Sequence, residues 1–220
     1  MEGIELFSIG EMFEKLGEVT PLGWVAFGVL IAFGIALLVL APKQKWDARM
    51  LSTAALCLAA SFVLSYIRLF RMPQGGSITL MSMLPVMLFS YIFGVVPGLL
   101  TGLAYGLLQT IQGAEFYSVM QFALDYFIAF GVLGLSGVTS KLPGKDSWKF
   151  PVGAAIAGLA RTFCSFLSGF IFFGQYAPEG QSPVVYSLVY NLSSIGVDTL
   201  ICVIGAYAIS ASGLVTRLKK

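Results

Sequence analysis

Three ionisable side chains lie inside long apolar stretches of the sequence: Asp125, Arg161 and Asp198. A charge in the hydrocarbon of a membrane is costly, so such a residue is by default a candidate for function. The sequence offers no Lys or Arg at the depth of Asp125, which we expect either to contact a ligand or to bond to neighbouring helices. Arg161 and Asp198 lie deeper, and we expect a structural ion pair between them. The chemistry indicated is the binding of a polar molecule.

Two predicted helices carry polar stripes that would surround such a molecule. The last helix repeats polar residues at i, i+4, i+7 and i+11, which is the spacing of one helix face, at Ser187, Asn191, Ser194 and Asp198. The helix before it carries a matching stripe at Arg161, Ser165 and Ser168. Facing stripes predict a cavity that opens outward and is closed beneath by the Arg161–Asp198 pair.

The residue types argue against an enzyme. Histidine is absent, which excludes Ser–His–Asp and Cys–His catalysis, HExxH zinc sites and His-ligated haem. Cys57, Cys164 and Cys202 are widely spaced in apolar runs, so we expect small core residues rather than disulfides or metal ligands. An aspartyl pair would need Asp125 and Asp198 close together, yet their predicted depths differ by roughly 10 Å. We therefore predict no catalytic residue, metal or cofactor.

The composition indicates a membrane protein. Of 220 residues, 57% are hydrophobic and only 11% are charged, which is too little charge to cover a soluble globule. Because a spanning helix needs about 20 mostly apolar residues, we predict an all-α integral membrane protein with spans near 21–41, 51–70, 80–96, 97–112, 117–138, 150–173 and 184–212. The third and fourth spans form one apolar stretch split by Gly94-Val95-Val96-Pro97-Gly98, and we expect a tight reversal there because Pro97 disfavours helix at Val96.

The ends and loops give an orientation. Residues 1–20 contain five glutamates and lack a basic start, so they predict an outer interfacial amphipathic segment rather than a signal peptide. Nine of the 13 Lys and Arg residues fall after the first span, after the fifth span or at the end of the chain. Since basic loops stay in the cytoplasm, we expect a multi-pass protein of a bacterial plasma membrane, with its N-terminus outside and its C-terminus cytoplasmic. The net charge of +2 excludes a nucleic-acid arm.

Small residues repeat at spacings that let helices approach closely. Gly98, Gly102 and Gly106 form a GxxxGxxxG pattern, for which we expect internal packing. Ala55 and Ala59 form an AxxxA face that can meet another protein.

The polar segment 68–79 follows directly on a span, and it is either a lid over the cavity or an ordinary surface turn. No GxxxxGK[ST] loop occurs, so the chain cannot itself use ATP to power transport. A small helical bundle that has a polar cavity but no ATP-binding motif of its own predicts a binding subunit of a larger complex.

Three stretches resemble the thiamine-specific S component of energy-coupling factor (ECF) transporters. They are Gly75–Gln109, the Asp125-Tyr126 pair within QFALDYFIAFG, and the run SGFIFFGQYAPEGQSPVVYSLVYN that ends at Asn191. The resemblance implies a six-helix substrate-binding membrane domain at 50–212, with 21–41 as an extra N-terminal transmembrane helix. It also implies capture of the vitamin from outside and docking on one scaffold (T) subunit and two ATPase subunits, with Ala55 and Ala59 at the scaffold interface.

The resemblance assigns the substrate-binding residues. Asp125 stands where the family has a carboxylate that meets the thiazolium or the aminopyrimidine, and Tyr126 is the neighbouring aromatic residue. Tyr186 and Asn191 match a YSLxxN pattern, and Gly169 matches a glycine that leaves room beside the ligand.

Three positions depart from the resembling sequences. Ser165 replaces a histidine, Phe173 replaces a tryptophan, and Gly76 falls near a lid tryptophan. We still expect Ser165 to line the site. Because ring stacking is reduced, the alternatives to thiamine are a thiamine precursor, an analogue or another vitamin on the same machinery, or a membrane scaffold that binds no ligand.

Overall fold

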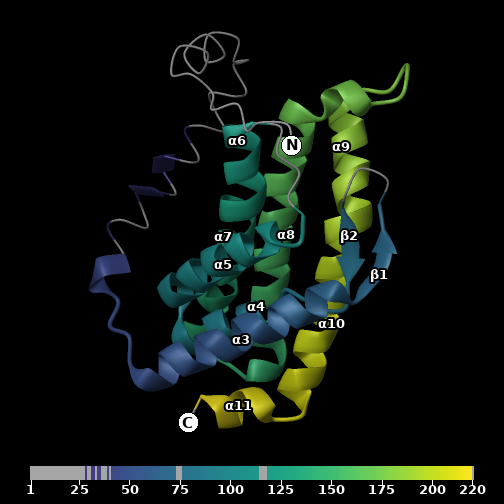
Figure 1. Ribbon diagram of the computed structural model, residues 1–220. Coiled ribbons are helices and arrows are strands. Elements are labelled where there is room, and N and C mark those ends of the chain that lie inside the picture. Colours follow the sequence, from purple (N-terminus) through teal and green to yellow (C-terminus); the bar gives the residue numbers. More distant parts are fainter. Residues whose placement is uncertain are drawn as a thin grey trace.

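The computed structural model describes residues 41–72, 76–113 and 118–219, with six residues before Ala41. These parts form a helical bundle with one short hairpin (Figure 1). The α-helices are α3 (Ala48–Tyr66), α4 (Leu84–Phe93), α5 (Val95–Thr110), α6 (Val119–Phe122), α7 (Ala129–Gly131), α8 (Asp146–Phe172), α9 (Pro183–Asn191), α10 (Val197–Ala211) and α11 (Leu214–Leu218). The other helical segments are η1 (Ala41–Lys43), η2 (Ala123–Ile128), η3 (Val132–Lys141), η4 (Gly174–Tyr176) and η5 (Leu192–Gly196).

Several of these elements continue one another. Segments α6, η2, α7 and η3 make one helical column over Val119–Lys141, and α9, η5 and α10 make a second over Pro183–Ala211. Together with α3 and α8, they are the four helices in the described residues that are long and apolar enough to cross a membrane. Helices α4 and α5 are apolar but shorter. The predicted all-α membrane class is confirmed.

The N-terminal predictions lie mostly outside the described residues. The interfacial segment 1–20 falls wholly outside them, as does most of the 21–41 span. The six described residues before Ala41 are helical.

One predicted boundary differs from the structure, and the predicted reversal between the third and fourth spans is present. The second span does not reach residue 70, because α3 ends at Tyr66 and Arg68–Arg71 forms strand β1, which pairs antiparallel with β2 (Ser77–Thr79). The reversal between α4 and α5 occurs at Gly94, the first residue of the predicted stretch, and its φ of 104° is a value that glycine adopts without a Cβ clash. Pro97 lies in the first turn of α5, where its missing N–H is not needed.

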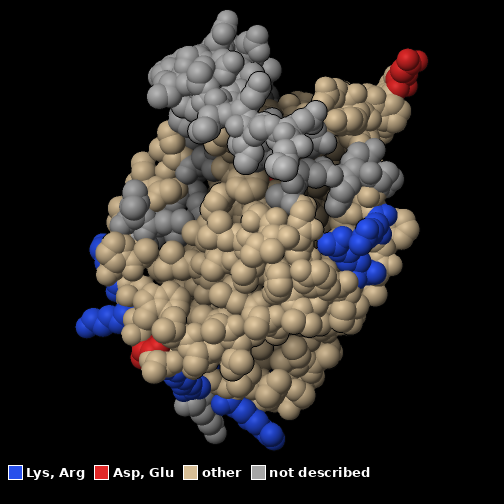
Figure 2. Space-filling model, in the orientation of Figure 1, with Lys and Arg blue, Asp and Glu red and all other residues tan. Residues whose placement is uncertain are grey.

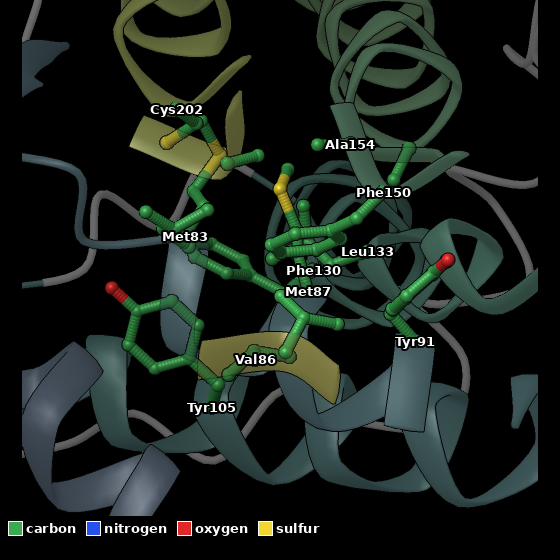
Figure 3. Packing of buried hydrophobic residues seen from close by; sticks show 14 residues of the cluster. Met83, Val86, Met87, Tyr91, Tyr105, Phe130, Leu133, Phe150, Ala154 and Cys202 are labelled. Atoms are coloured by element: carbon green, nitrogen blue, oxygen red, sulfur yellow. The ribbon is translucent and has the colours of Figure 1, made fainter. Parts of the chain in front are cut away.

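The apolar core lies where α4, α5, α8 and α10 meet the Val119–Lys141 column (Figure 3). The rings of Tyr105 and Phe130 meet edge to face at 5.1 Å, and those of Tyr91 and Phe150 lie 5.0 Å apart. Cys202 is buried in the same cluster, as expected for a core cysteine. This packing fixes the position of Phe130, whose ring also lines a polar cavity.

The α5 glycines permit contact between two backbones. A Cβ on Gly102 would meet the carbonyl oxygen of Phe130, and a Cβ on Gly106 would meet that of Tyr126. A Cβ on Gly98 would meet the Ser90 side chain. The expected internal packing is confirmed, and it presses α5 against the column that carries Asp125.

Two turns of π-helix interrupt the long columns. Segment η2 contains Asp125, and η5 lies between Asn191 and Asp198. Wide turns of this kind occur often at functional sites. Both occur in the elements that carry the predicted binding residues.

Helix α11 is fastened across one end of the bundle. The Asp146 carboxylate accepts hydrogen bonds from Tyr91 Oη at 2.7 Å and Thr216 Oγ1 at 3.2 Å, and it pairs with Lys219 Nζ at 2.8 Å. Arg49 Nη2 donates to the Leu218 carbonyl at 2.6 Å. Lys and Arg side chains lie along this lower rim and in a second patch at the right, by the β1–β2 hairpin, and the broad area between them carries no charge (Figure 2).

Candidate functional site

The polar residues converge on a cavity of about 300 Å³. Its walls come from the hairpin, α5, the Val119–Lys141 column, α8 and the α9–α10 column. All six predicted substrate-binding residues line it, namely Asp125, Tyr126, Ser165, Gly169, Tyr186 and Asn191. The volume is at the lower end of the range for small-molecule sites. Both predicted polar stripes also line it in full.

Asp125 is held in place by two neutral donors. Its Oδ2 accepts a hydrogen bond from Gln121 Nε2 at 2.6 Å and another from Ser168 Oγ at 2.8 Å. Gln121 is one helical turn before Asp125, whereas Ser168 comes from α8. Hydrogen bonds from neutral donors orient a carboxylate without cancelling its charge. The wall therefore presents an oriented carboxylate to the cavity.

Helices α8 and α9 approach closely at Gly169. A Cβ there would meet Ser187 Oγ and lie 3.1 Å from Asn191 Nδ2. Ser187 Oγ donates to the Phe166 carbonyl at 2.7 Å, and Asn191 Nδ2 donates to the Ser187 carbonyl at 2.9 Å. Gly169 therefore allows the two helices to contact each other and also leaves space in the cavity.

The segment 68–79 forms a wall of the cavity through the β1–β2 hairpin. Four of its described residues line the cavity, namely Arg68, Gly76, Ser77 and Thr79. The Gly76 amide donates to Tyr190 Oη at 3.3 Å, which ties the hairpin to α9. The three positions that depart from the resembling sequences, Gly76, Ser165 and Phe173, all face the same space.

The predicted ion pair between Arg161 and Asp198 is not formed. Both line the cavity, but the ion pairs within 4.0 Å in the described part of the chain are those of Asp146. Thr79 Oγ1 instead donates toward both Asp198 oxygens, at 3.2 and 3.0 Å, and the Arg161 guanidinium lies 3.9 Å from the centroid of the Phe130 ring. Sequence periodicity places neither the hairpin nor the Phe130 ring, so it could not anticipate these contacts.

Several lining residues were not predicted from the sequence. Gln121 could have been found, because it lies one turn from Asp125 on the same helix face. Gln112 Nε2 donates to Ser65 Oγ, and Arg68 Nη2 donates to Gln112 Oε1 at 3.4 Å. These polar residues lie at the ends of helices and strands. Polar residues at such positions are ordinarily expected on the surface, so the sequence did not identify them as cavity residues.

Comparison with known proteins gives a consistent result. The family model described as thiamine transporter protein matches residues 51–216. The thiamine transporter ThiT of Bacillus subtilis is 36% identical over 162 residues, which are 68% of this chain and 84% of that protein. ThiT of Lacticaseibacillus paracasei is 31% identical over 136 residues, 56% of this chain and 67% of that protein.

A solved structure of ThiT from Listeria monocytogenes matches with a TM-score of 0.68 at 26% identity, over 77% of this chain and 96% of that one. The family match, the relatives and the shared fold cover well over half of the sequence. This chain therefore belongs to the thiamine transporter family.

Proposed function

We propose that this chain is the substrate-capture subunit of an ATP-driven ECF vitamin importer and that it binds thiamine from outside the cell in the cavity described above. One observation carries the proposal: six residues from distant parts of the sequence surround one cavity whose wall holds an oriented carboxylate. Membership of the thiamine transporter family supports thiamine as the ligand.

The cavity suits a cationic heterocycle. Asp125 supplies a negative charge within a helix bundle, where attraction is less screened than in water. Tyr126 and Tyr186 line the same space and offer ring faces to a cation. Thiamine carries a permanent positive charge on a flat ring, so both features favour its binding.

The direct test is calorimetric titration of the detergent-purified protein with thiamine. Calorimetry is preferable to fluorescence because neither described tryptophan, Trp46 or Trp148, lines the cavity. Tight binding of one thiamine per chain is the expected result. If thiamine fails but the isolated aminopyrimidine or thiazole alcohol binds, the ligand is a thiamine precursor. If none of the three binds to folded protein, thiamine capture by this chain is refuted.

The charge distribution supports a cytoplasmic position for the end that carries α11. Arg49, Lys149 and Lys219 meet there through their contacts with Leu218 and Asp146. Basic residues favour the cytoplasmic side. In this orientation the hairpin and the cavity mouth face outward, as substrate capture requires.

Helix α3 offers the surface for the scaffold subunit. Ala55 and Ala59 are exposed on it, while Met50 and Ala54 pack inward with Phe89. An exposed small-residue pair lets a partner helix approach closely. We propose the T subunit as the partner for this surface, in an assembly that also contains the two ATPase subunits.

Replacing Ala55 or Ala59 by Trp should abolish thiamine uptake and leave thiamine affinity unchanged, because the bulky ring keeps the scaffold helix away while the cavity stays intact. Uptake of labelled thiamine by cells and calorimetry on the purified variants separate the two effects. Leu200→Trp is the matched control, since Leu200 is exposed on α10 and should retain uptake. Normal uptake by both alanine variants would remove α3 from the interface.

Gly169→Leu should weaken thiamine binding by about 1–3 kcal/mol, the usual cost of overfilling a packed site. The new side chain must displace Ser187 and Asn191 or occupy the cavity itself. Gly196→Ala is the matched control, because its Cβ would meet atoms no closer than 3.6 Å. Calorimetry gives the affinities, and unaltered binding in Gly169→Leu would place the ligand away from this wall.

A further inference from the structure

The inner part of the cavity holds a cationic group with open hydrogen-bonding capacity. In the described part of the chain, Arg161 Nε is buried without a hydrogen-bond partner. The guanidinium lines the cavity and covers the Phe130 ring at 3.9 Å. A buried donor left unsatisfied is costly, so an acceptor from a ligand would be favourable here.

Asp198 supplies the complementary group. It lines the same cavity, and its carboxylate already accepts from Thr79 Oγ1, which is also 2.6 Å from Ser82 Oγ. A carboxylate can accept further hydrogen bonds, because its two oxygens offer about four lone-pair sites. The inner part of the cavity therefore presents a strong donor in Arg161 and an acceptor in Asp198.

This inner part lies below Asp125. Ser168 bonds to Asp125, and Arg161 is seven residues earlier on the same regular helix, which is about 10 Å along its axis. That separation is comparable with the length of a small two-ring molecule with a side arm. One such molecule can reach both groups.

The aromatic residues indicate how that molecule is oriented in the cavity. Tyr126, Phe173, Tyr186 and Tyr190 line the cavity, while the face of Phe130 is already covered by the guanidinium. Flat rings are therefore better accommodated beside these four residues than beside Phe130. The inner part suits a narrow polar arm that both accepts and donates a hydrogen bond, which is what an alcohol does.

We propose that Arg161, together with Asp198, receives the hydroxyl of the ligand's alkyl arm, and that Arg161 determines the preference for an alcohol at this position. The inference rests on the proposed function, because the hydroxyethyl group of thiamine is the arm concerned. The guanidinium donates to the hydroxyl oxygen, and the hydroxyl donates to the Asp198 carboxylate.

The test compares thiamine with its deoxy analogue, in which the hydroxyethyl arm is an ethyl group. Calorimetry on the wild-type protein should show a preference for thiamine of about 10- to 100-fold, the effect of one hydrogen bond to a charged group. Arg161→Met should reduce this preference to below about threefold, because the donor is lost. Ser165→Ala is the control: it alters another lining residue and should change both affinities by the same factor.

The wild-type protein alone can overturn the inference, whether or not Arg161→Met folds. Equal affinities for thiamine and deoxythiamine would show that the hydroxyl is not recognised. An undiminished preference in a folded Arg161→Met variant would remove Arg161 from that recognition. Both results leave thiamine capture standing, whereas a wild-type protein that binds neither compound refutes the proposed function and this inference together.

Discussion

Asp125→Asn is expected to weaken thiamine binding by about 1–3 kcal/mol, the size of a lost charge-assisted hydrogen bond. The amide keeps the shape of the carboxylate, so the contacts with Gln121 and Ser168 can rearrange without opening the bundle. What disappears is the negative charge that faces the cationic ring. Calorimetry on the purified variant measures the loss directly.

A neutral ligand shows whether the loss of affinity comes from the lost charge or from a disturbed cavity wall. An analogue in which a thiophene replaces the thiazolium has nearly the same shape and no charge, so Asp125→Asn should barely change its affinity. Glu179→Gln is the charge control, since Glu179 is exposed on the loop between α8 and α9 and should leave both affinities unchanged. Equal losses of affinity for thiamine and the neutral analogue would show that Asp125 keeps the cavity wall in place and does not interact with the cationic ring.

Gly102→Ala is expected to destabilise the folded protein by at least about 1–3 kcal/mol. The added Cβ would meet the Phe130 carbonyl and lie 3.1 Å from the Gly131 backbone, so two backbones must separate to admit it. Backbone contacts cannot be relieved by a change of rotamer. Thermal unfolding in detergent should show a clearly lower midpoint.

The helical glycine Gly196 again provides the comparison. Its Cβ would lie 3.6 Å or more from its neighbours, and alanine is a better helix former than glycine, so Gly196→Ala should keep or raise the midpoint. If Gly102→Ala were as stable as Gly196→Ala, the close approach of α5 to the Val119–Lys141 column would not contribute to stability.

Much of the bundle follows from patterns in the sequence. The apolar stretches near 117–138, 150–173 and 184–212 match helical columns within a few residues, because membrane spans need long apolar runs. The polar stripes also predicted which faces line a cavity, since 3.6-residue periodicity fixes the side of a helix on which a residue lies.

The exceptions have a common physical cause. The β1–β2 hairpin has too few residues to show a period, and it is the hairpin that provides Thr79 as the partner of Asp198. Arg161 was expected to pair with Asp198 on grounds of charge alone, but a long side chain can reach several partners and here lies on Phe130. Residue spacing predicts faces and depths, whereas rotamers depend on the surrounding tertiary contacts.

The π-helical turn η5 sets the rotational phase of α10 relative to α9. Each residue advances an α-helix by about 100° but a π-helix by less, so winding all five residues of 192–196 as regular α-helix would turn everything beyond them by up to about that angle. Asp198 would then leave the cavity while Asn191 stayed in place. The winding of this turn is therefore as much a part of the binding surface as the side chains themselves, and relatives that wind this stretch differently should differ in what they admit at the inner end.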